Sequence, residues 1–101
     1  MYGTVARMLL KSEVPDDAMT QVAEDAAQIP GLISSYLYQS DEDPRELFLA
    51  VVFESREAYV ANAERPEQHE RYLKMRELLE DDPEWHDGDV VHRYVAAAAV
   101  S

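Results

Sequence analysis

The sequence contains no cysteine among its 101 residues. It can therefore form neither a disulfide framework nor a thiolate metal site. Glycine is almost as scarce, because Gly3, Gly31 and Gly88 are the only three and lie far apart. A phosphate-binding loop needs closely spaced glycines, so a nucleotide site of that kind is excluded. No serine stands in a GxSxG motif, which excludes the hydrolases that carry their nucleophile there.

Positive charge is also in deficit. Nine lysine and arginine residues stand against 21 acidic residues, and the net charge at pH 7 is -12. A field of this sign repels phosphate backbones and anionic lipid, so we expect neither nucleic acid nor a membrane surface as a partner. No apolar run approaches the ~18 residues of a membrane span. Strand-like residues begin at Tyr2, so we expect no signal peptide and a cytoplasmic protein.

The apolar residues that are present follow strand and helix periods in turn. Pro30 and Gly31 end the first helical segment, the turn DEDP at 41–44 joins two strands, and Ser55 suits a helix N-cap. The predicted order in one domain is β-α-β-β-α-β, with the second helical region split in two. The expected strands span 2–11, 32–40, 47–53 and 89–95, and the expected helices span 14–29, 55–62 and 66–81.

The third predicted strand, LFLAVVF at 47–53, is apolar on both faces. Its neighbours alternate between apolar and polar residues, as in an antiparallel sheet with helices on one face and water on the other. The second face of this strand therefore needs a cover, and no predicted element is left to supply one. We expect a homodimer in which the sheets of two copies pack together.

Three passages together resemble a known family: PGLISSY entering the second strand, LFLAVVFESREAYVAN from the third strand into the short helix, and RPEQHERYLKMRELL in the long helix. They resemble the antibiotic biosynthesis monooxygenase domain over residues 1–95, which leaves 96–101 as a C-terminal tail. The resemblance implies an α+β, ferredoxin-like subunit with an antiparallel four-stranded sheet. It also implies that two subunits pair into a dimeric α+β barrel, each with a cavity between its sheet and its helices.

The same resemblance bears on cofactors, because the family includes cofactor-independent oxygenases of polycyclic phenols as well as haem-degrading enzymes. The haem-degrading branch uses an asparagine on the first strand, a tryptophan at the end of the short helix and a histidine on the next helix. At the matching positions this sequence has Arg7, Asn62 and Tyr72. The iron ligand is therefore missing, and haem degradation is the less favoured function. The three histidines show no HxxxH or HxH pairing, so we expect no metal site.

Three candidate catalytic residues come from the helices after the third strand. His69 and Tyr72 recur at helical spacing with Arg76 and form one stripe. A histidine can take a phenolic proton, while a tyrosine hydroxyl and a guanidinium can hold the resulting oxyanion. Each also has an ordinary explanation, since His69 lies among charged residues and Tyr72 suits packing beneath the sheet. Asn62 is the third candidate, or it caps the short helix.

The candidate substrate-binding residues are Arg76 and two strand residues, Arg7 and Tyr36. Arg7 is a cation on an otherwise apolar strand face and needs a partner, either a substrate oxyanion or an internal carboxylate. Tyr36 follows two serines whose small side chains leave room for a ligand or for close helix packing. We expect the pocket on the helix-facing side of the sheet, around 62–76, with Arg7 and Tyr72 in its lining.

Together with the resemblance, these residues favour a monooxygenase that needs no cofactor and acts on a small aromatic substrate, a phenol or quinol, in an apolar pocket. The alternative is a non-catalytic dimeric barrel that binds a ligand or has a structural role, because one fold supports both. Conversion of a substrate distinguishes the two.

Overall fold

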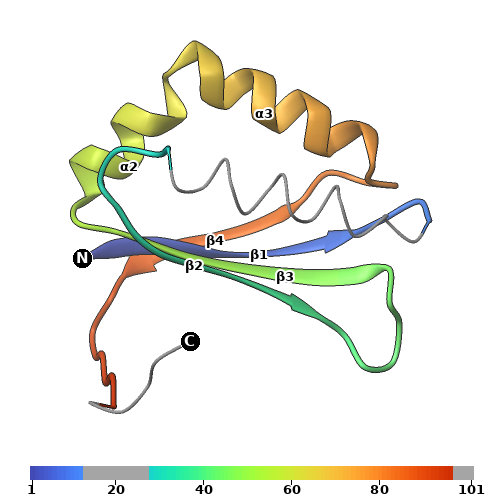
Figure 1. Cartoon of the computed structure of the whole chain (residues 1–101), viewed down its shortest axis with the longest axis horizontal. Helices are drawn as coiled ribbons and strands as arrows, with labels where there is room; N and C mark the ends of the chain where they lie inside the picture. Colours follow the sequence, from blue (N-terminus) through green and yellow to red (C-terminus); the bar gives the residue numbers. More distant parts are fainter. Residues whose placement is uncertain (13–27, 97–101) are drawn as a thin grey trace.

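The computed structural model describes residues 1–12 and 28–96. Four strands form one antiparallel sheet, and the two described helices lie on one of its faces (Figure 1). The helix expected over 14–29, apart from its last two positions, and the end of the tail fall outside the described residues. The elements are β1 (Tyr2–Leu9), β2 (Leu32–Gln39), β3 (Glu46–Phe53), α2 (Arg56–Ala63), α3 (Pro66–Glu77) and β4 (Glu84–Asp89).

The strand order is β2-β3-β1-β4, and every neighbouring pair is antiparallel. β1 and β2 therefore run parallel to each other with β3 between them. This order, with helices on one face, is the ferredoxin-like α+β fold that the sequence predicted. β1 and β3 are the two central strands, and each is hydrogen-bonded to a neighbouring strand on both of its edges.

The core lies between the sheet and the helices. Alternate residues of β1 point toward the helices, and Ala6, Met8 and Leu10 are each at most 4% exposed. Met8 and Leu10 join Leu47 and Leu79 in one apolar cluster. Leu79 follows α3 and pairs with Leu10 through an isolated bridge. Burial of a leucine stabilises the fold by about 2 kcal/mol, so Leu79 anchors the end of the helical layer on the sheet.

The helical layer divides where the sequence predicted. The Ser55 hydroxyl accepts a hydrogen bond of 3.1 Å from the backbone N–H of Ala58 and caps α2. Pro66 is the first residue of α3, where a missing N–H costs nothing. Arg65 before it is extended, at φ -76° and ψ 137°, because proline disfavours the helical conformation at the preceding residue. Neither α2 nor α3 is long and apolar enough to cross a membrane.

The opposite face of the sheet carries no described helix (Figure 1). Several large side chains on it are exposed, including Val5 at 49%, Tyr36 at 59% and Tyr38 at 57%. We call this side the open face, and the strand register places on it Val5, Arg7, Leu9, Tyr36, Tyr38, Phe48, Ala50 and Val52. The helix-facing side of β3 is buried at Leu47 and Phe53. One apolar face of this strand therefore lies in the core, and the other belongs to the open face.

Two predicted boundaries are wrong. β4 spans Glu84–Asp89 rather than 89–95, and Val91 beyond it is 95% exposed. All six residues of β4 are exposed, because backbone pairing with β1 at the edge of the sheet forms this strand, and apolar periodicity therefore cannot locate it. α3 ends at Glu77 rather than near 81, because Leu79 leaves the helix to enter the core.

Candidate functional site

Asn62, in the last turn of α2, is the buried residue of that helix and is 7% exposed. Its side-chain oxygen Oδ1 is buried and has no hydrogen-bond partner within the described part of the chain. A buried amide oxygen without a partner costs about 1–3 kcal/mol. The C-cap of α2 is Glu64, so helix capping does not explain the Asn62 side chain. An uncompensated group of this kind is a candidate for contact with a ligand.

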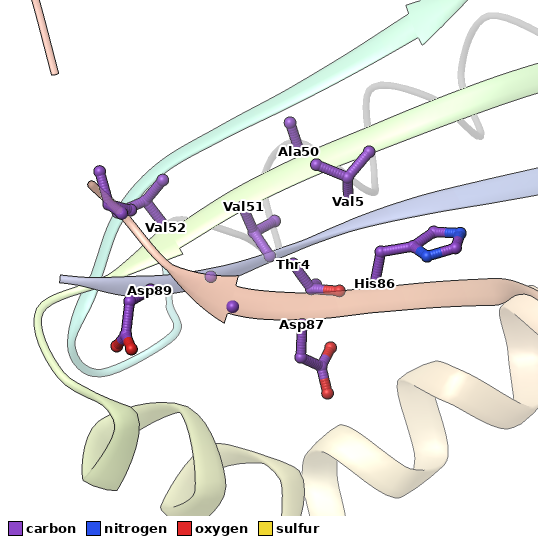
Figure 2. A pocket seen from close by; sticks show the side chains of 11 residues that line it. Thr4, Val5, Ala50, Val51, Val52, His86, Asp87 and Asp89 are labelled. Carbon is purple, nitrogen blue, oxygen red and sulfur yellow. The ribbon is translucent and has the colours of Figure 1, made fainter. Parts of the chain in front are cut away.

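Tyr59 lies three positions before Asn62 and shares its side of α2. The Tyr59 hydroxyl donates a hydrogen bond of 3.0 Å to Oδ1 of Asp87. Asp87 belongs to β4, and its side chain points toward the helices (Figure 2). Burial, the hydrogen bond to Asp87 and the charge of that carboxylate raise the pKa of Tyr59 to about 12. Tyr59 is therefore a neutral hydroxyl at physiological pH.

Thr4 of β1 is the cross-strand partner of Asp87 and is 4% exposed. Its hydroxyl acts against the rise in the pKa of Tyr59. Thr4 Oγ1 nevertheless has no hydrogen-bond partner among the described residues. We call the four residues that α2, β1 and β4 bring together the polar cluster: Thr4, Tyr59, Asn62 and Asp87.

The ring of Tyr59 packs against two other aromatic rings, which are cross-strand neighbours on the sheet. Its centroid lies 5.3 Å from that of Tyr2 and 5.4 Å from that of Phe53, both in tilted arrangements. Tilted pairs at this distance are favourable because the positive edge of one ring meets the negative face of the other. The hydroxyl of Tyr59 is thus positioned from the sheet as well as from α2.

The stripe predicted on α3 does not act as one unit. His69 is exposed and Tyr72 is half-buried. Arg76 contacts Asp82 Oδ1 through Nε at 2.7 Å and donates to the Leu79 carbonyl at 3.0 Å. These contacts tie Arg76 to the chain that leaves α3, so its guanidinium is already occupied there.

Arg7 and Tyr36 both lie on the open face. The expectation that Arg7 lines a pocket between the sheet and the helices is wrong, because the alternation that turns Ala6 and Met8 toward the helices turns Arg7 away from them. Arg7 pairs with Glu46, at 2.7 Å from Nη2 and 2.8 Å from Nε to the same carboxylate oxygen. Its partner is thus an internal carboxylate, one of the two alternatives that the sequence left open.

A shallow hollow of about 240 Å³ lies on the open face. Gly3 and Gly88, opposite each other in β1 and β4, both line it, and the position of a Cβ is empty at Gly88. Val5 and His86 point to this side, whereas Asp87 points to the helices (Figure 2). A second hollow, of about 510 Å³, lies against the outer side of α2. Neither hollow lies between the sheet and the helices, and no group of three metal-ligating side chains gathers within residues 1–12 and 28–96.

Sequence reasoning missed three members of the polar cluster. The spacing of Tyr59 and Asn62 on one helix side was a usable signal for Tyr59. Thr4 and Asp87 carried no comparable signal, because their meeting depends on the register of β4 against β1. With the last strand predicted five positions too late, Asp87 fell outside it.

The profile of the family described as antibiotic biosynthesis monooxygenase matches residues 1–75. The chain belongs to the antibiotic biosynthesis monooxygenase family. The match includes Thr4, Tyr59 and Asn62 and ends within α3, so Asp87 lies beyond it. Among curated proteins, none gives a significant sequence match.

Solved structures share the fold at low sequence identity. SnoaB, a cofactor-independent oxygenase from Streptomyces nogalater solved as an asparagine-to-alanine mutant, has a TM-score of 0.76 and 16% identity over 91% of this chain and 94% of its own. A Streptomyces coelicolor monooxygenase in complex with nanaomycin D has a TM-score of 0.73 and 17% identity over 95% and 92%. A conserved protein from Methanosarcina mazei has a TM-score of 0.73 and 19% identity over 86% and 89%. Antibiotic biosynthesis monooxygenases and proteins of other descriptions thus share this subunit fold.

Proposed function

We propose that this protein is a monooxygenase that uses no metal or organic cofactor and oxidises a small phenol or quinol. The observation that carries the proposal is Asn62, a buried amide whose oxygen no described residue satisfies, in a chain of the antibiotic biosynthesis monooxygenase family. The substrate would bind between α2, α3 and the sheet. Of the two candidates on α3, half-buried Tyr72 is better placed to touch it than exposed His69.

The chemistry needs a proton acceptor and a stabilised anion. For an anthrone-type substrate, a base removes one proton, either from the methylene group or, in the enol tautomer, from the hydroxyl group, and the resulting anion transfers an electron to O₂. The two radicals join through a new C–O bond to give a peroxide. Loss of water from this peroxide, with the second methylene hydrogen, leaves a carbonyl group. One oxygen atom enters the product and the other leaves as water, so no external reductant is needed.

Asn62 suits the stabilising role because its amide has both kinds of hydrogen-bonding group. The amide NH₂ can donate to a developing oxyanion, and Oδ1 can accept from a substrate hydroxyl. An amide does not take up protons at neutral pH, so the base must be another group. Water is largely excluded around Asn62, where a hydrogen bond to an anion is stronger than in solution.

Two structural relatives support this proposal by their descriptions. SnoaB is described as a cofactor-independent oxygenase, and an asparagine is the residue replaced in its solved mutant. The Streptomyces coelicolor monooxygenase was solved with the ligand nanaomycin D. We propose the same type of reaction, and a small aromatic ligand, for this chain.

Oxygen uptake tests the proposal directly. Chelator-treated protein should consume one O₂ per molecule of dithranol or of anthrone and should form the corresponding anthraquinone. With labelled O₂ and dithranol, one labelled atom should enter the product. Absence of uptake above a protein-free control with every compound would reject the oxygenase and favour the alternative, a non-catalytic ligand-binding barrel.

We also propose that two copies of the chain pair through the open face. This face carries exposed apolar and aromatic side chains that include Val5, Tyr36 and Tyr38. A single chain leaves an apolar patch of this kind in contact with water, which is unfavourable. A second copy covers both open faces at once, and a stable homodimer interface would bury about 2,000 Å² in total.

Substitution of Val5 by lysine is expected to convert the dimer to a monomer. Val5 lies on a central strand of the open face, and a buried unpaired ammonium opposes association strongly. Light scattering coupled to size exclusion measures the mass. Val60→Lys is the matched control, because Val60 is similarly exposed, at 41%, but lies on α2. A wild-type mass of one chain at micromolar concentration would overturn the dimer.

A further inference from the structure

The Tyr59–Asp87 hydrogen bond has a direction with chemical consequences. Asp87 is the acceptor, so Tyr59 commits its only hydrogen to that carboxylate. The lone pairs of the Tyr59 oxygen remain, and they can accept a hydrogen bond from another hydroxyl group. Tyr59 therefore acts toward a ligand as an acceptor, and it is selective for groups that donate.

Two further polar atoms of the polar cluster have no partner among the described residues: Thr4 Oγ1 on the sheet and Asn62 Oδ1 on α2. Thr4 is 4% exposed and Asn62 is 7% exposed, so solvent does not satisfy them freely. Tyr59 shares its helix side with Asn62, and its partner Asp87 pairs with Thr4 across the sheet. Unsatisfied buried groups on the same helix side as Tyr59 and beside its partner Asp87 indicate a place for a polar atom of a ligand.

We infer that Tyr59 and Asp87 recognise the hydroxyl group of an aromatic substrate and accept its proton. When the substrate O–H bond breaks, its proton passes to the Tyr59 oxygen and the Tyr59 proton passes to the Asp87 carboxylate. The electron pair stays on the substrate oxygen, and Tyr59 ends neutral as it began. Asp87 is exposed and releases the proton to water. This step involves no oxidant, and only its link to turnover rests on the proposed function.

Variants of Tyr59 and Asp87 distinguish recognition of the substrate hydroxyl from transfer of its proton. Tyr59→Phe removes the hydroxyl and keeps the ring against Tyr2 and Phe53, so the fold is retained. Asp87→Asn keeps an oxygen that accepts from Tyr59 but removes the carboxylate that takes the proton. Asp89→Asn is the matched control, because Asp89 lies in the same strand and points to the same side without a bond to Tyr59 (Figure 2).

Binding is measured first, by titration under nitrogen with 1-naphthol and with its methyl ether. The ether presents the same ring system but has no hydrogen to donate. Wild type is expected to bind naphthol about 3- to 10-fold more tightly than the ether, the effect of one neutral hydrogen bond. The ratio should fall to about 1 in Tyr59→Phe and persist in Asp87→Asn and Asp89→Asn.

Turnover is measured next, as oxygen uptake with dithranol. Asp87→Asn and Tyr59→Phe should each lower kcat by about 10²-fold, and the double variant should be no worse than either, because both interrupt one transfer. For Asp87→Asn the KM should stay unchanged. Full kcat in Asp87→Asn would overturn the proton transfer.

The binding ratio decides recognition independently of catalysis. An unchanged ratio in Tyr59→Phe, or failure of wild type to bind either compound, would overturn the inference. A ratio that falls as expected in a protein without oxygen uptake would support recognition by Tyr59 and reject only the proposed oxygenase. Circular dichroism of each variant confirms that it is folded.

Discussion

Replacing Asn62 by leucine is expected to lower oxygen uptake by about 10²-fold or more while leaving the melting temperature unchanged or higher. Leucine has nearly the same shape as asparagine and brings no polar atom into the site. It therefore removes both the group that would stabilise the substrate anion and the buried Oδ1 that lacks a described partner. An oxygen electrode gives the rate, and thermal unfolding followed by circular dichroism gives the stability.

The opposite pair of results would contradict this role. If Asn62 supports the fold alone, the leucine variant should lose several degrees in melting temperature and retain its activity per folded molecule. Ala61→Leu is the control, because Ala61 is the neighbouring residue of α2 and is exposed. It should change neither the rate nor the melting temperature appreciably.

Replacing Gly3 by alanine is expected to destabilise the protein by about 3 kcal/mol or to prevent folding. A Cβ at this position would overlap the carbonyl oxygen of Val51 and lie 3.2 Å from the Cα of Val52. Both contacts are to the backbone of β3, so no side-chain rotation relieves them. Urea unfolding measures the loss, which corresponds to a fall in melting temperature of roughly 10–20 °C for a domain of this size.

Gly88→Ala is the matched control for Gly3, since the two glycines face each other in β1 and β4. A Cβ at Gly88 meets no atom within 4 Å, and this variant should stay within about 0.5 kcal/mol of wild type. Equal stability of the two alanine variants would show that the approach of β1 to β3 at Gly3 is not tight.

Local sequence predicted the features that depend on a few neighbouring residues. The cap at Ser55 and the helix start at Pro66 were placed correctly, because capping and proline geometry act within one turn. Gly31, placed in a turn before β2, has φ 77°, which glycine adopts without strain. The alternation of β1 also separated Ala6 from Arg7 before the face of each was known.

Local sequence did not predict an element whose position is determined by hydrogen bonds to a neighbouring strand. β4 has no buried residue, and its position follows from backbone hydrogen bonds with β1. Arg7 was assigned to the helix side because a cation on an apolar strand suggested a ligand, yet it lies on the open face with Glu46. A strand's alternation defines two faces but does not say which of them the helices cover.

The sequence by itself determined the fold class and the family, and it singled out Asn62 at the end of a short helix. The fold class follows from periodicity, caps and breakers that act over short distances, whereas the family follows from the resemblance of three sequence passages to its domain. Only the tertiary structure decided which residues meet, because Tyr59 and Asp87 lie 28 positions apart in the sequence. Their contact requires both the register of β4 against β1 and the position of α2 on the sheet. Long-range register depends on the packing of the whole sheet, and no local pattern in the chain encodes it.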